Sequence, residues 1–360
     1  MLSPFYKWLL VMGMWLTIGR IMAQEAVADT ITPQEVLYSK ASKLIDSAKY
    51  KEGVVLLKKA IKLRPDYWEA FNKMAFAKIK LKDYKGAEKD LLKAEEIAPL
   101  NYETIKLKGI NFFLSGNYKE AKTMLDTALY VLTEEKIEDA ELYYYRAQLM
   151  FLGKSYKSAL ENCEVALDYR PNYPEVQLLK GQIRFAQKEY NHAVRELSTA
   201  IDKMPETNRE YLAYELRAKS KFELGDYKGA VSDWNVYIEG IPGEEQSLIS
   251  RAAAKINTGE NTSAIIDLDD AIKLNGKNPV SYCYRGVAKG GNKQYVEALK
   301  DLDFSIKLKF DYAAAYVNRA AIKMASKDKR GACADLEKAD GLGDELAIKL
   351  IEQYCRDSRN

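Results

Sequence analysis

The chain has 360 residues, with 55 lysines and arginines against 52 aspartates and glutamates, and a formal net charge of +3. This near balance argues against nucleic acid as the main ligand, because nucleic-acid-binding proteins usually carry a strong basic excess. The single histidine, His192, lies in an expected turn with no serine, cysteine or metal ligand patterned around it. The sequence also lacks metal-ligand spacing and a glycine-rich phosphate loop. We therefore expect a protein that is not an enzyme and takes no metal and no cofactor.

The first 23 residues have the pattern of a secretory signal peptide. Lys7 precedes a twelve-residue apolar run, Trp8–Gly19, and Ala23 is a suitable cleavage residue. A membrane-spanning helix needs roughly 20 apolar residues, so the run is short for a span. We expect cleavage after Ala23 and export; the alternative is an uncleaved membrane anchor. Residues 24–33 are polar and are expected to form a flexible lead-in.

Pairs of small residues, seven positions apart, recur along residues 34–340. Most steps between pairs are 34 residues, and two are 38 and 37. A fixed period of this size predicts a solenoid, in which each unit buries its apolar face against its neighbours. Tyr237 replaces one of these small residues and is expected to widen the packing or meet a smaller neighbour. The first members of the pairs are Gly53, Ala87, Ala121, Ala159, Ala193, Ala230, Ala264, Ala298 and Ala332; the second are Ala60, Ala94, Ala128, Ala166, Ala200, Tyr237, Ala271, Ser305 and Ala339.

The unit from Phe71 to Pro99 shows two amphipathic helices joined by a polar turn at residues 82–86 and ended by a proline. A tyrosine recurs in this turn, at Tyr50, Tyr84, Tyr118, Tyr156, Tyr190, Tyr227 and Tyr295. These features resemble the tetratricopeptide repeat family. The resemblance implies an all-α, right-handed α-solenoid superhelix of about nine helix pairs over residues 34–340. Residues 341–360 are then a C-terminal capping helix and tail.

The resemblance extends to the end of the chain, which is similar to the ending of secreted bacterial members of the family. This similarity implies that Cys333 and Cys355 face each other, and we expect a disulfide between them. Cys163 and Cys283 fall within predicted helices, where Cys163 is expected to stay a buried thiol. The alternative is four reduced thiols.

A charge ladder, defined as four arginines each followed sixteen residues later by an aspartate, runs along the C-terminal units. A lysine also follows each arginine by four residues, where the two like charges share a helix face and repel. The structural interpretation is that the aspartates join the two helices of each unit and neighbouring units. The functional alternative is a basic strip that binds a carboxylate-rich or phosphorylated partner. The pairs are Arg217 and Asp233, Arg251 and Asp267, Arg285 and Asp301, and Arg319 and Asp335.

In the family, the first helices line a concave groove that binds extended peptides or helices. Helical spacing places apolar residues on one candidate groove face here, and exposed apolar surface of this kind marks interaction sites. The alternative is that the superhelix buries these residues itself. They are Ile249, Ala253, Ile256, Val280, Cys283, Val287, Val317, Ala321 and Met324.

Some family members bind carboxylate tails through a clamp of lysines and asparagines on their first helices. Asn72 and Lys106 occupy clamp-like places, but the remaining positions do not match. We expect a non-catalytic scaffold or adaptor, exported to the periplasm, cell envelope or beyond, that binds peptide or protein partners in the groove. The alternative is a membrane-tethered structural component that self-associates.

Overall fold

The computed structural model describes residues 32–204 and 210–355. The expected signal peptide, most of the lead-in and the C-terminal tail lie outside these residues. The described chain is helical and has no strand, and none of its helices combines the length and apolarity needed to span a membrane. The chain divides into two compact units, residues 1–149 and 150–360, which are described separately.

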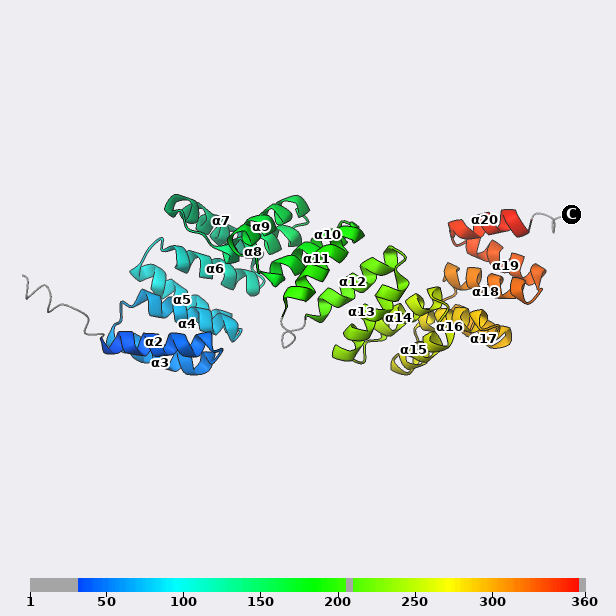
Figure 1. Cartoon of the computed structure of the whole chain (residues 1–360), viewed down its shortest axis with the longest axis horizontal. Coiled ribbons are helices and arrows are strands. Elements are labelled where there is room, and N and C mark those ends of the chain that lie inside the picture. The colour runs from blue at the N-terminus through cyan, green and yellow to red at the C-terminus, as the bar shows by residue number, and fades with distance from the viewer. Residues whose placement is uncertain (1–31, 205–209, 356–360) are drawn as a thin grey trace, which may run out of the picture. The chain divides into compact units, whose positions relative to one another are not determined.

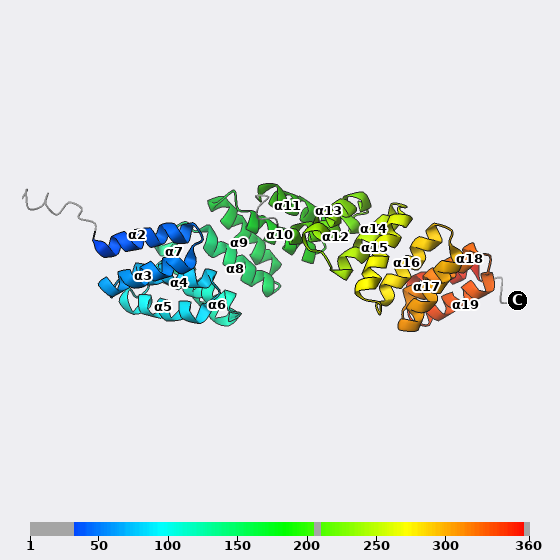
Figure 2. The same ribbon diagram turned by 90° about the horizontal axis from the view of Figure 1, so that it is seen from below.

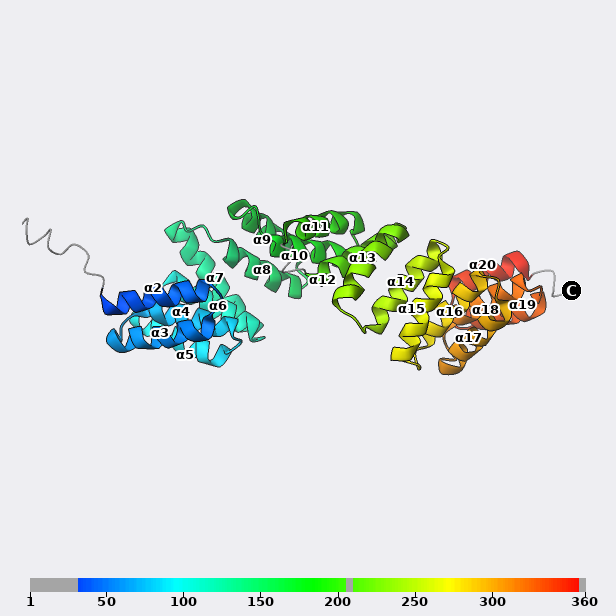
Figure 3. The same ribbon diagram turned by 60° about the horizontal axis from the view of Figure 1, so that its bottom comes forward.

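The first unit contains helices α2 to α7 and most of α8 (Figure 1). Helices α2 and α3 lie side by side, as do α4 and α5, and α6 and α7 (Figure 3). The first helices α2, α4 and α6 also contact one another in turn. The bounds are α2 Pro33–Asp46, α3 Tyr50–Leu63, α4 Trp68–Lys80, α5 Tyr84–Ile97, α6 Tyr102–Leu114, α7 Tyr118–Glu135 and α8 Ala140–Leu152.

The second unit continues with five helix pairs, α10/α11 to α18/α19 (Figure 2), and a last helix, α20, that packs on α19 (Figure 1). The first helices α14, α16 and α18 again contact one another in turn. The bounds are α9 Tyr156–Tyr169, α10 Pro174–Ala186, α11 Tyr190–Lys203, α12 Tyr211–Glu223, α13 Tyr227–Gly240, α14 Glu245–Asn257, α15 Asn261–Leu274, α16 Pro279–Gly291, α17 Tyr295–Leu308, α18 Ala313–Ala325, α19 Lys329–Asp340 and α20 Glu345–Tyr354.

The predicted all-α repeat solenoid is confirmed, and the small residues explain how its helices approach. The paired alanines have no exposed surface. Gly109, Gly181 and Gly286 lie on first helices where an added Cβ would stand within 3 Å of a leucine side chain on the second helix. Small residues on one helix facing large ones on its partner give dense packing without a void.

Tyr237, which takes the place of a paired alanine, is also buried. It packs edge-on against Trp234, with ring centroids 5.5 Å apart. Both rings belong to a cluster that contains Ala218 and Ala254. The large side chain is thus accommodated in the core beside a second large ring.

Candidate functional site

Each arginine of the charge ladder holds its aspartate through two parallel hydrogen bonds. The Nε atom donates to one carboxylate oxygen, and one terminal nitrogen donates to the other. The two distances are 2.9 and 2.6 Å for Arg217–Asp233, 2.9 and 2.7 Å for Arg251–Asp267, 2.9 and 2.7 Å for Arg285–Asp301, and 2.8 and 2.5 Å for Arg319–Asp335. This two-point geometry is the strong, specific form of an arginine–carboxylate pair.

The lysine four residues after each arginine joins the same aspartate. The Nζ to Oδ2 distances are 2.8 Å for Lys221, 2.8 Å for Lys255, 2.7 Å for Lys289 and 2.8 Å for Lys323. Every ladder aspartate side chain is less than 10 % exposed. A buried carboxylate between two cations therefore offsets the repulsion between the arginine and the lysine on the first helix.

The remaining terminal nitrogen of each arginine reaches the second helix of the preceding repeat. Arg285 Nη1 donates to Asp269 at 2.6 Å, and Arg319 Nη1 donates to Asp303 at 2.6 Å. The corresponding acceptors are Asn235 for Arg251 and Ser198 for Arg217, both at 3.0 Å. Each guanidinium thus links three helices from two repeats.

Burial alone would lower the pKa of Arg285, but its hydrogen bonds to Asp301 and Asp269 outweigh this effect and raise the pKa. The hydrogen bond to Asp335 is the main cause of the raised pKa of Arg319. The ladder arginines are 15–18 % exposed and their donors point at protein acceptors. This geometry favours the structural interpretation of the ladder over an exposed strip that binds anions.

Toward the N-terminus, the ion pairs at the ladder positions are longer or join other residues. Lys180 lies 2.8 Å from Glu164 and 3.6 Å from Glu196, which stand sixteen residues before and after it. Arg146 pairs with Asp126 of the preceding repeat, twenty residues before it rather than sixteen, because helix α7 has 18 residues where α5 and α9 have 14. The sixteen-residue spacing does not predict this pair. The four residues inserted beyond the regular period are the sequence signal that predicts it.

The nine groove residues do not form one exposed apolar surface. Ile249, Ala253, Cys283 and Val317 are buried within the array. Ile256, Val280, Val287 and Met324 are half-buried, and Ala321 is exposed. The alternative to an open groove, in which the superhelix buries these residues itself, therefore holds for Ile249, Ala253, Cys283 and Val317.

Three of the groove residues, Ile249, Ala253 and Val280, do meet at a cavity of about 240 Å³, here called the α14 pocket. Its lining comes from the first helices α12, α14 and α16, with one aromatic ring from α13. The sequence reasoning missed its aromatic residues, because Phe222 and Trp234 lie on the two helices of one repeat and Tyr284 lies in another repeat. The full lining is Lys219, Phe222, Glu223, Trp234, Gln246, Ile249, Ser250, Ala253, Val280 and Tyr284.

A second cavity, of about 410 Å³, lies in the first unit among α2, α4 and α6 and is called the α4 pocket. The polar groups of the clamp-like residues Asn72 and Lys106 are bound to other side chains of the protein. Asn72 is buried and exchanges hydrogen bonds with Thr104, at 2.9 and 3.1 Å. Lys106 lies 2.8 Å from Asp139 and 3.0 Å from Glu103. The α4 pocket is lined by Tyr38, Asp46, Trp68, Glu69, Asn72, Lys73, Phe76, Glu103 and Leu107.

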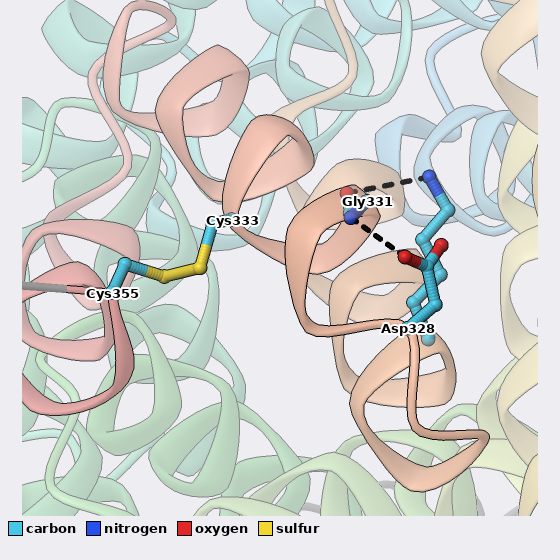
Figure 4. The surroundings of a disulfide bond; sticks show 5 residues. Asp328, Gly331, Cys333 and Cys355 are labelled. Carbon is cyan, nitrogen blue, oxygen red and sulfur yellow. Dashed lines mark hydrogen bonds between the residues drawn. A yellow bond between two sulfur atoms is a disulfide. The ribbon is translucent and has the colours of Figure 1, made fainter. Parts of the chain in front are cut away.

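A disulfide joins Cys333 of α19 to Cys355 at the end of α20 (Figure 4). Asp328 caps the N-terminus of α19 by accepting a hydrogen bond from the Gly331 amide at 2.8 Å. Cys163 and Cys283 are free and buried. Burial raises the pKa of the Cys163 thiol to about 12 and also raises that of Cys283, so both are poor nucleophiles at neutral pH.

His192 lies at the start of α11, half exposed, with Nδ1 3.2 Å from the Glu189 carboxylate. Within residues 32–204 and 210–355, no group of three or more histidine, cysteine or acidic side chains is arranged to hold a metal ion.

No protein-family model and no curated protein matches the chain. Among solved structures, PilF from Pseudomonas aeruginosa has a TM-score of 0.52 and 17% identity, covering 59% of this chain and 93% of its own. PilW, a type IV pilus biogenesis factor, has a TM-score of 0.52 and 15% identity, covering 60% and 96%. A tetratricopeptide repeat protein from Parabacteroides merdae is 20% identical, with a TM-score of 0.42, covering 79% and 97%. The helix pairs, their period and the likeness to PilF and PilW together show that the chain has the fold of the tetratricopeptide repeat proteins.

Proposed function

We propose that the protein is a non-catalytic scaffold that binds a peptide segment of a protein partner at the α14 pocket. The observation that carries the proposal is an open cavity with apolar and aromatic walls on three successive first helices. Ligand pockets are typically concave and mainly apolar, with a few polar groups that orient the ligand. Here Lys219, Glu223 and Gln246 supply polar groups beside Ile249 and Val280.

The chemistry of the α14 pocket selects the kind of anchor that a partner would insert. Phe222, Trp234 and Tyr284 supply three aromatic rings in its wall, so an aliphatic or aromatic side chain is the expected occupant. Lys219 is ion-paired with Glu215 one turn earlier on α12, which keeps its charge compensated in the absence of a partner. Affinity would then come from a buried apolar anchor rather than from a charge clamp.

Filling the α14 pocket tests this proposal. Ser250 lines the pocket and is half-buried, so Ser250→Phe places a ring in the cavity without replacing a core residue. Peptides selected from a displayed library on the wild-type protein should bind Ser250→Phe roughly tenfold more weakly or worse, as expected when one apolar anchor loses its cavity.

Ser232→Phe is the matched control, since Ser232 is exposed on the second helix α13 and lies outside the lining. Selected peptides should bind this variant as they bind the wild type. Equal binding to wild type and Ser250→Phe, with both proteins folded by circular dichroism, would move the binding site elsewhere.

We also propose that the protein is exported, on the pattern of residues 1–23 and on the cysteine pair near the C-terminus. Intact-mass measurement on protein isolated from its own cells should give a chain that starts at Gln24 and carries one disulfide. Retention of residues 1–23 would favour the membrane-tethered alternative. A chain isolated without reductant that carries four free thiols would contradict an oxidising destination.

A further inference from the structure

The α4 pocket differs in chemistry from the α14 pocket, because aromatic rings and carboxylates share its wall. Tyr38, Trp68 and Phe76 contribute three rings, and Asp46, Glu69 and Glu103 contribute three carboxylates. Lys73 is the single basic residue in the lining. Rings attract cations over their faces, and carboxylates attract them directly, so both parts of this wall favour a positively charged occupant.

Two of the three carboxylates already have a cationic neighbour. Asp46 lies 3.2 Å from the Lys73 ammonium, and Glu103 lies 3.0 Å from that of Lys106. The Glu69 oxygen Oε2 is buried, and no described residue donates a hydrogen bond to it. A buried carboxylate oxygen without a donor is costly, and a ligand that supplies the donor removes that cost.

The phenol of Tyr38 reports the electrostatic character of this cavity. Burial is the main cause of its raised pKa, and the charges of Glu69, Glu103 and Asp46 raise it further. Three acidic side chains therefore act on one ring in the pocket wall. Their effect disfavours any anion there, the reverse of what a clamp for carboxylate tails requires.

We infer that the α4 pocket binds a lysine or arginine side chain of a protein partner, with Glu69 as the acceptor and the aromatic rings as its walls. Its volume of about 410 Å³ leaves room for a long side chain to enter from solvent. Charge complementarity selects this occupant: an acidic segment would add negative charge to an already acidic cavity, and an apolar one would leave Glu69 Oε2 without a donor.

The test uses a pentapeptide with one central arginine and the same peptide with citrulline, which has the same shape and no charge. The full chain is labelled with 5-fluorotryptophan. Trp68 lines the α4 pocket and Trp234 lines the α14 pocket, so fluorine NMR, with resonances assigned from Trp→Phe variants, separates the two sites. The arginine peptide should shift the Trp68 resonance and leave that of Trp234 in place. The citrulline peptide should bind roughly tenfold more weakly, the effect of about 1.4 kcal/mol.

Two variants and a control decide the role of the carboxylate. Glu69→Gln should weaken arginine-peptide binding by roughly tenfold, whereas Glu52→Gln, at an exposed position of α3, should not change it. Lys73→Gln removes the competing cation and should strengthen binding, a gain that misfolding cannot mimic. Equal affinity for the two peptides, or binding that survives Glu69→Gln, would overturn the inference. Because the Trp68 and Trp234 resonances are independent, failure here leaves the proposal for the α14 pocket intact.

Discussion

At the scale of the residue, each ladder aspartate of the second unit is held by both an arginine and a lysine. Asp301 accepts hydrogen bonds from Arg285 and Lys289 while its own side chain is 9 % exposed. A buried ion pair costs desolvation energy, which good geometry and further hydrogen bonds must offset. Its clearest consequence is specificity, because only the correct register of one repeat on the next brings Arg285 to both Asp301 and Asp269.

Arg285→Ala tests this role. The substitution removes three hydrogen bonds and leaves Asp301 with Lys289 alone, so the free energy of unfolding should fall by about 1–3 kcal/mol. Urea unfolding followed by circular dichroism measures the change.

Lys273→Ala is the comparison, since Lys273 and its partner Asp270 are 75 % and 52 % exposed and exposed pairs contribute little to stability. This control should unfold at the same urea concentration as the wild type. If Arg285→Ala behaves like the control and instead weakens binding of an acidic peptide, the anion-binding interpretation of the ladder is the right one.

At the scale of the element, the turn inside each repeat is shorter than the sequence pattern indicates, because the tyrosines assigned to it are the first residues of the second helices. Seven second helices begin at the turn tyrosines, and the other two begin at Asn261 and Lys329. Two residues before each start, the backbone has positive φ, a conformation that glycine adopts without strain. Glycine supplies it only three times, which is why the glycine pattern alone marks the turns poorly. The nine residues are Ala48, Lys82, Gly116, Lys154, Lys188, Gly225, Gly259, Lys293 and Lys327.

The period also made the charge ladder predictable, because a constant step of 34 residues places the same pair of positions in contact in every unit. The ladder breaks at Arg146, because Asn162 stands where the aspartate would be; the contact of Arg146 with the preceding repeat moves to Asp126, because α7 is four residues longer than α5 or α9. The 34-residue period did not predict the two pockets. Each is lined by non-repeating residues from three first helices, such as Trp68, Glu69 and Glu103, and the contacts among those helices are set by packing rather than by spacing.

At the scale of the whole molecule, a solenoid has stability that is approximately a sum over repeats and their interfaces. Each helix pair of the second unit contacts the pairs before and after it, and the last pair ends against α20. The apolar face of that pair is covered by Ala347 and Ile351 of the cap, which join the cluster around Leu336 and Tyr316. The cap therefore protects the end of the array, and the disulfide holds the cap in place.

Breaking the disulfide should consequently loosen the array from its C-terminal end. Cys333 and Cys355 are 22 residues apart, and a bridge closing a loop of this length stabilises by about 3 kcal/mol. With a phosphine reductant, amide hydrogen exchange should rise most in α20 and α19, less in α18, and not at all in α10 and α11. Cys163 and Cys283 are free thiols, so the bridge is the reductant's one target among the described cysteines.

The double variant Cys333→Ser, Cys355→Ser should show the loosened exchange pattern without reductant and should not respond when reductant is added. The gradient is the informative part of the result, because nearest-neighbour coupling requires the effect to fade from one repeat to the next. A uniform rise in exchange from α10 to α20 would show instead that the second unit opens as a single cooperative block. No rise in α20 would show that packing of Ala347 and Ile351 holds the cap without the bridge.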